Sequence, residues 1–150
     1  MEDGSVEYVG FWVRVGASLV DTVLVLALIY PLLIMIYGWG YFDALTDGLV
    51  VGKADFLLSY VVPALAVILF WLTKQATPGK MLFGAKVVDA RTGQGLTPGQ
   101  SVGRYLGYYV SMLPLGLGLL WVAFDARKQG WHDKLAGTVV VRAKRPGPRP

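Results

Sequence analysis

The sequence predicts an all-α membrane protein with two transmembrane helices, a broken or re-entrant helical hairpin and a small cytoplasmic β element. Its 150 residues suit one domain; 55% of them are hydrophobic and 16% are charged. Soluble domains average about 45–50% apolar and about 25% charged residues. The apolar excess is concentrated at 15–37, 56–73 and 105–124. Stretches of this length indicate a protein that spans a membrane.

Two spans are expected in the first half of the chain. The first covers about 11–37, long enough for a hydrocarbon core of about 30 Å, and Pro31 is expected to kink it. The second covers about 56–73, with a kink at Pro63. The loop between them, 38–55, is rich in glycine and is expected to be irregular.

The middle of the chain predicts helix starts and strands. The tripeptide Thr-Pro-Gly occurs at 77–79 and again at 97–99. A threonine followed by proline favours the first turn of a helix, with threonine as the N-cap. The runs 85–90 and 138–142 resemble strands, and we expect them to pair at the cytoplasmic surface.

Basic residues predict the orientation in the membrane. Lysine and arginine number one in 1–14, one in 38–55, five in 74–104 and seven in 125–150. Cytoplasmic loops are the basic ones, so we expect both termini inside and the 38–55 loop outside, in a cell inner membrane.

The third apolar stretch is then expected to enter the membrane and return. Residues 102–124 would form a hairpin broken near Pro114 to Gly118, a poor helix centre. The alternative is one kinked span with an external C-terminus. Residues 1–142 are expected to form a single membrane domain, followed by a disordered basic tail at 143–150.

Composition excludes several classes of function. The chain has no cysteine, which excludes disulfides and thiolate metal sites, and its one histidine excludes a multi-histidine metal site. No cofactor motif and no pairing of nucleophile with base is visible, so an enzyme is not expected. The net charge is +4, and the basic residues flank the apolar segments. This placement indicates the orientation of the chain in the membrane and not nucleic-acid binding. An acidic N-terminus argues against a signal peptide.

Asp21 is the only charged residue of the run from Val15 to Tyr37. A charge at bilayer depth costs about 2.5–3.5 kcal/mol on insertion scales, and such residues are biased toward function. Arg14 lies seven residues earlier, about two turns away on the same helical face. We expect the two to form either a structural pair or a proton or monovalent-cation site at Asp21.

A second group of polar side chains follows the last apolar stretch: Asp125, Arg127, His132 and Asp133. Asp125 is expected to meet Arg14 or Arg104 near the inner face. His132 is either a proton relay, because histidine titrates near physiological pH, or a hydrogen-bonded structural residue. Asp133 is expected to cap a short helix that ends at Gly137.

Several blocks of the sequence carry a family resemblance. They are Arg14 with Asp21, Thr77-Pro78-Gly79-Lys80, Gly84-Ala85-Lys86-Val87-Val88-Asp89 and His132-Asp133-Lys134-Leu135-Ala136-Gly137-Thr138-Val139-Val140-Val141. Together they resemble the RDD family of membrane proteins, named for one arginine and two aspartates, over residues 10 to 142. The last aspartate matches either Asp125 or Asp133. The resemblance implies a small multi-pass protein; some members look like sodium(potassium)/proton antiporters and others like assembly subunits.

The leading hypothesis is therefore exchange of a monovalent cation for protons across the lipid bilayer. Asp21 would bind the two in alternation, Arg14 would tune its affinity, and Asp125 would add a second carboxylate. Two and a half spans are too few to enclose a pathway, which implies a homo-oligomer. The alternative is a scaffold or assembly subunit that transports nothing, in which the charges fix helix packing.

Overall fold

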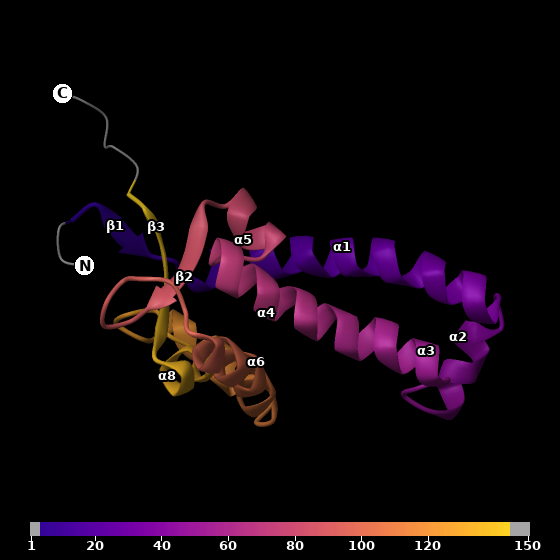
Figure 1. Cartoon of the computed structure of the whole chain (residues 1–150). Coiled ribbons are helices and arrows are strands. Elements are labelled where there is room, and N and C mark those ends of the chain that lie inside the picture. Colours follow the sequence, from indigo (N-terminus) through magenta and orange to yellow (C-terminus); the bar gives the residue numbers. More distant parts are fainter. Residues whose placement is uncertain (1–3, 145–150) are drawn as a thin grey trace.

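Two long helices form a hairpin that extends to one side of the molecule (Figure 1). The structure is a computed structural model and describes residues 4–144. α1 (Phe11–Tyr37) is one helix of 27 residues. The second span consists of α3 (Lys53–Phe56), a π-helical turn (Leu57–Val61) and α4 (Val62–Lys74). Both spans are long and apolar enough to cross a membrane, which confirms the two predicted ones.

The prolines affect the two spans differently. α1 continues as one helix through Pro31. In the second span the irregular turn, Leu57–Val61, comes just before Pro63, which is the second residue of α4. Proline has no N–H to offer the carbonyl four residues earlier, so the helix widens where that hydrogen bond is missing.

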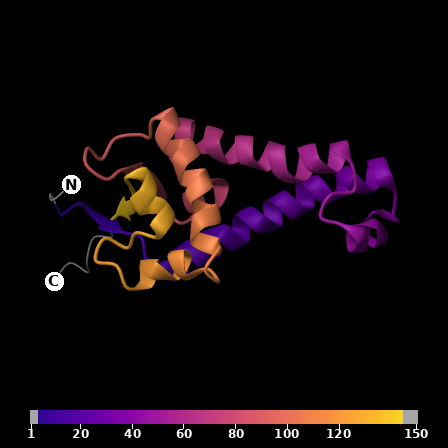
Figure 2. The same ribbon diagram turned by 90° about the horizontal axis from the view of Figure 1, so that it is seen from below.

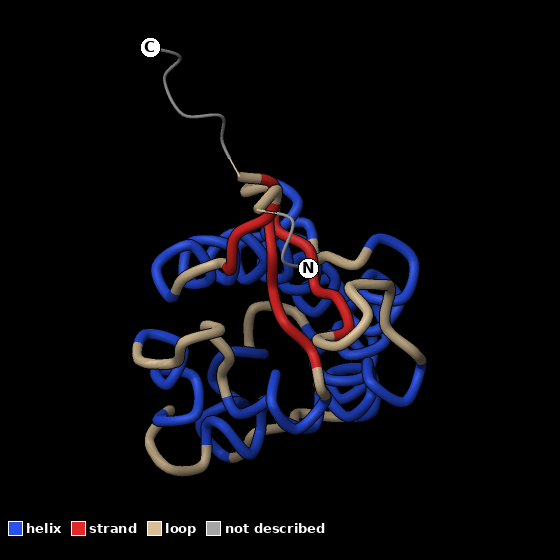
Figure 3. The backbone as a smooth tube through the Cα atoms, turned by 90° about the vertical axis from the view of Figure 1, so that its left-hand side faces the viewer, coloured by secondary structure: helices blue, strands red, loops and turns tan. Residues whose placement is uncertain are grey.

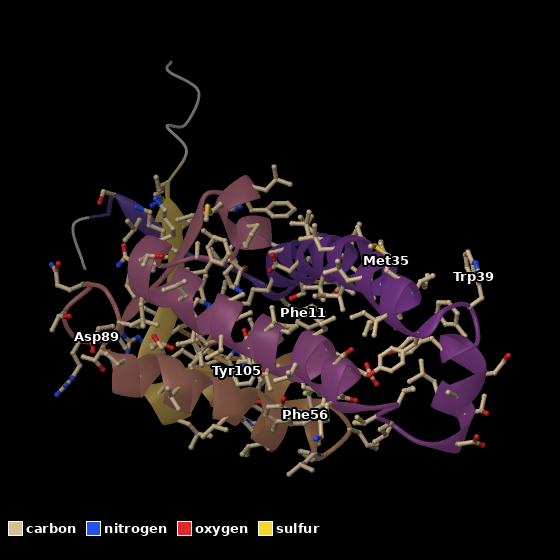
Figure 4. The ribbon with its side chains drawn as sticks, turned by 45° about the vertical axis from the view of Figure 1, so that its right-hand side comes forward. Phe11, Met35, Trp39, Phe56, Asp89 and Tyr105 are labelled. Atoms are coloured by element: carbon tan, nitrogen blue, oxygen red, sulfur yellow. The ribbon has the colours of Figure 1, made fainter. Side chains whose placement is uncertain are left out.

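The far end of the hairpin is organised around one buried carboxylate. α2 (Tyr41–Ala44) and a 3₁₀ turn (Leu45–Asp47) connect the spans. Asp55 is buried; it accepts hydrogen bonds from the Tyr41 hydroxyl at 2.8 Å and from the Val51 N–H at 2.7 Å. Figure 4 places Trp39 at this far end and Asp89 at the opposite end, where the sheet lies.

A three-stranded antiparallel sheet holds both described ends of the chain (Figure 3). Its order is β1 (Val6–Tyr8), β3 (Thr138–Ala143), β2 (Ala85–Asp89). The predicted pairing of the second and third strands is confirmed, in the register Val87 opposite Val140. The sequence did not predict β1, because three residues with an acidic centre give too little of a strand pattern.

The two described termini therefore lie together. The Lys144 N–H donates to the Ser5 carbonyl at 2.9 Å. β3 extends through Ala143, one residue into the predicted tail, and residues 145–150 of that tail lie outside the described residues.

Short helices surround the sheet at the base of the hairpin. They are α5 (Pro78–Leu82), α6 (Pro98–Met112), α7 (Leu117–Leu120) with a 3₁₀ turn (Trp121–Ala123), and α8 (Trp131–Ala136). The third apolar stretch bends by 110° between α6 and α7, so the predicted break is confirmed. Leu115 and Gly116 take positive φ at this break. α6 runs across the axis of the hairpin and not along it (Figure 2).

The core lies at the base and not between the spans. Val9, Trp71, Val87 and Val140 are buried together there. In each span, only 6% of the most apolar 18-residue stretch is buried inside the protein. Apolar side chains exposed along both spans are what a lipid-facing surface requires. The buried charged residues Lys80, Arg104 and Asp133 also lie at the base.

Candidate functional site

Asp133 is the centre of a buried charge cluster at the base of the hairpin. Its side chain is fully buried; the Arg14 Nη1 donates to its Oδ2 at 2.6 Å, and the Arg104 Nη1 donates to its Oδ1. The Gly130 N–H donates to Oδ2 at 2.9 Å, so Asp133 caps α8 from inside its first turn; the helix begins three residues earlier than predicted, with Gly130 as its N-cap. One carboxylate thus ties together α1, α6 and α8.

Each guanidinium is held by further contacts. Arg14 donates from Nη2 to the Lys128 carbonyl at 2.6 Å, which turns it away from α1. Arg104 donates to the Thr138 hydroxyl at 2.8 Å, and its guanidinium lies 5.1 Å from the centre of the Trp71 ring. Tyr108 presents a second ring, 5.6 Å from the guanidinium, so Arg104 is a buried cation stabilised by one carboxylate and two aromatic rings.

This cluster stays ionised over a wide pH range. Burial alone would raise the pKa of Asp133, but Arg104 and Arg14 outweigh it and hold that pKa below its usual range. Removing one partner of such a buried pair strongly destabilises the fold, because the other charge is left without compensation.

Asp21 does not pair with Arg14; each of the two side chains has a partner from another element instead. The Thr77 hydroxyl donates to Asp21 Oδ2 at 2.6 Å, and the Gly79 N–H donates to Oδ1 at 2.7 Å. Seven helical residues span about 10.5 Å, too far for a direct contact, and Arg14 finds Asp133 instead. Asp21 thus fastens the first turn of α5 onto α1.

The two Thr-Pro-Gly copies have different structural roles. Thr97 accepts from the Gln100 N–H at 3.1 Å and begins α6 with the expected N-cap. Thr77 begins α5 without capping it, because its hydroxyl points to Asp21. Gly79 lies so close to α1 that a Cβ there would be 1.9 Å from the Ala17 carbonyl oxygen. Lys80, which follows, is buried.

The other predicted residues are divided between the surface and the interior. Asp125 pairs with Lys134 at 2.7 Å, so the expected contact with Arg14 or Arg104 is wrong. Arg127 donates to the Ala90 carbonyl at 2.8 Å, beside the sheet.

His132 is buried and stacks on Tyr108, with ring centres 3.9 Å apart. Burial, and then the positive charge of Arg104, lower the pKa of His132 from 6.5 to about 3. The lowered pKa keeps the ring neutral at physiological pH, which favours the hydrogen-bonded structural alternative over the proton relay. His132 is the only histidine in the chain.

A pH series is expected to reveal this buried neutral ring. A group whose pKa is lower in the folded state stabilises the fold in full above its unfolded pKa and less as pH falls toward the folded value. Stability should therefore fall by about 2 kcal/mol between pH 7 and pH 5. Denaturant titrations in detergent at each pH measure it. In His132→Gln the slope over this range should vanish, and a slope unchanged in that variant would contradict the assignment.

Two cavities flank the Lys80 side chain. One, of about 310 Å³, lies among α1, α4 and α6 and is lined by Asp21, Thr77 and Tyr105, among others. The other, of about 440 Å³, lies between α1 and α7 and ends at Arg14 and His132. Ser18, Thr22, Lys80 and Tyr108 line both. Asp21 is therefore at the edge of a cavity as well as bonded to α5.

Thr77, Gly79, Lys80 and Thr138 were not predicted as site residues. The repeated tripeptide was a usable signal for the first two, because only one copy needed to start a long helix. Lys80 follows that tripeptide in a conspicuous Gly-Lys pair that fits no phosphate loop.

Comparisons with known proteins support the family resemblance of the sequence. A sequence model of the RDD family matches residues 8–137. The uncharacterized protein YxaI of Bacillus subtilis is 29% identical over 88% of this chain and 95% of its own length. The uncharacterized membrane protein YteJ of the same organism is 34% identical over 91% and 82%. A proline-rich antigen homolog of Mycobacterium tuberculosis is 36% identical over 42% of this chain and 26% of its own. No solved structure matches.

Proposed function

Because this chain belongs to the RDD family of membrane proteins, we propose that it is a transporter that exchanges a monovalent cation for protons at Asp21. The observation that carries the proposal is the position of Asp21 on a membrane-spanning helix, at the edge of a cavity of about 310 Å³ that it shares with buried Lys80. Ionisable residues inside a span are functional candidates by default when they face a cavity.

The cavity has the chemistry that this exchange needs. Asp21, Thr22, Thr77 and Tyr105 line it, and their side chains carry the oxygen atoms that hard cations prefer as ligands. Burial lowers the pKa of Lys80 and the negative charge of Asp21 opposes that shift, so the charges of the two groups depend on each other. Arg14 is already paired with Asp133, so Lys80 is the cation that tunes the affinity of Asp21.

The proposal includes the oligomeric state and the orientation in the membrane. Two spans with exposed apolar faces do not enclose a pathway, so we propose a homo-oligomer in the cell inner membrane. The basic ends of the chain would lie in the cytoplasm, because the loops of the base are the basic ones.

Asp21→Asn is expected to abolish cation-dependent proton flux. The amide cannot carry the charge that alternates between proton and cation, yet its oxygen still accepts the Gly79 N–H and keeps α5 in place. The measurement is proton flux in liposomes with a pH-sensitive dye inside and sodium or potassium outside. Asp125→Asn is the control; it removes a carboxylate that pairs at the surface with Lys134, and flux should persist. Flux retained in Asp21→Asn would remove this residue from the mechanism.

A scaffold role is the second candidate, and the closed Arg14–Asp133–Arg104 cluster favours it. A charge network with its partners satisfied fixes packing and needs no ion. In that case the wild-type liposomes show no flux, and Asp21→Asn lowers only the unfolding midpoint or the assembly size.

A further inference from the structure

The larger cavity is lined by apolar and cationic side chains. Val15, Leu19 and Leu119 line it between α1 and α7. Arg14, in the first turn of α1, and Lys80, on α5, also line it. A volume of about 440 Å³ lies within the range of about 300–1,000 Å³ for small-molecule sites.

The charged residues that line this cavity, Arg14 and Lys80, are both cationic. Arg14 and Arg104 share one carboxylate, Asp133, so two positive charges meet one negative charge. Lys80 is 6% exposed, and among residues 4–144 its ammonium has neither a hydrogen bond nor an ion pair. A buried ammonium without a partner is expensive, which makes an anion the missing component.

The open side of the cavity faces apolar surroundings. Leu19 is 61% exposed and Leu115 is 97% exposed, and both are on its lining. In a membrane this rim contacts hydrocarbon, so a ligand enters from the bilayer with an apolar part along α1. Its acidic part then reaches Arg14 and Lys80, near the start of the span where headgroups lie.

We propose that this cavity binds an anionic phospholipid, with the phosphate at Arg14 and Lys80 and one acyl chain along α1 and α7. This inference goes beyond the exchange at Asp21: Asp21 lines only the other cavity, and Lys80 lines both.

Lipid binding to the purified full chain in neutral detergent tests the proposal. The probe is fluorescent phosphatidylglycerol, displaced by unlabelled phosphatidylglycerol, phosphatidylcholine or inorganic phosphate. We expect phosphatidylglycerol to compete at least tenfold better than phosphatidylcholine, and millimolar phosphate not to compete. Equal competition by the two lipids would overturn the proposal, and displacement by phosphate alone would indicate a free-anion site instead.

Two variants and a matched control locate the site. Leu119→Trp fills the cavity and should weaken phosphatidylglycerol binding at least tenfold. Leu69→Trp, on the exposed face of α4 and away from both cavities, should leave binding unchanged. Lys80→Met removes a buried charge, so it should fold and should lose the preference for the acidic lipid. Unchanged binding and preference in both Leu119→Trp and Lys80→Met would contradict the site.

The same assay separates this inference from the transport proposal. Asp21→Asn should bind phosphatidylglycerol like the wild type, whatever its effect on flux. Leu119→Trp tests the lipid without touching the Asp21 cavity. Asp21→Asn and Leu119→Trp therefore separate the two proposals, whereas Lys80→Met changes a residue that lines both cavities and reports on lipid preference alone.

Discussion

Asp133→Asn is expected to lower the unfolding free energy by about 3–5 kcal/mol. The amide leaves Arg14 and Arg104 without a carboxylate, and the Arg104 side chain is fully buried. Its remaining contacts, with the Thr138 hydroxyl and with Trp71 and Tyr108, do not neutralise its charge. α1, α6 and α8 would then lose the group that joins them.

Denaturant titration in detergent micelles, followed by helical circular dichroism, measures the loss. Glu7→Gln is the matched control, because it also removes one carboxylate from an arginine pair, Glu7 with Arg142. Those side chains are 36% and 32% exposed, and such surface pairs contribute about 0–1 kcal/mol. Similar losses in both variants would show that burial of the Asp133 cluster does not matter.

Gly79→Ala is expected to destabilise the fold by about 3 kcal/mol, the upper end of overpacking effects. The added Cβ would lie 1.9 Å from the Ala17 carbonyl oxygen and 2.8 Å from its carbon. Backbone atoms in a helix do not yield, so α5 must move off α1. The hydrogen bonds from Thr77 and Gly79 to Asp21 would break with that movement.

The second Thr-Pro-Gly copy supplies the control for this substitution. At Gly99 a Cβ would meet only the Thr97 hydroxyl oxygen at 3.9 Å, an ordinary contact. Gly99→Ala in α6 should be neutral or stabilising by up to about 1 kcal/mol, because alanine is the better helix former. Both variants are compared by unfolding midpoint. Equal effects at the two positions would contradict the close approach of α5 to α1.

The spans, the strand pairing and the break in the third apolar stretch could be predicted because each is a local pattern. Hydrophobic length identifies a span, and Val-rich runs identify β2 and β3. β1 has no comparable pattern, and it is a strand only because β3 lies beside it. Its identity depends on a partner more than 130 residues away.

The partners of the charged residues could not be predicted from spacing. Arg14 and Asp21 share a helix, so sequence reasoning joined them; the fold separates them by supplying Asp133 to one and Thr77 with Gly79 to the other. Asp125 and Asp133 are close in sequence, yet only Asp133 faces inward, because α8 turns that side chain toward α1 and α6. Tertiary packing decides such pairs.

The Arg14–Asp133 bond also sets an order of events during synthesis. Arg14 leaves the ribosome before its carboxylate, which follows 119 residues later. At about 5–20 residues per second, the delay between the two is on the order of 10 s. The start of α1 is therefore completed by α8, the last helix among residues 4–144, and a chain interrupted before α8 retains a guanidinium without its counter-ion.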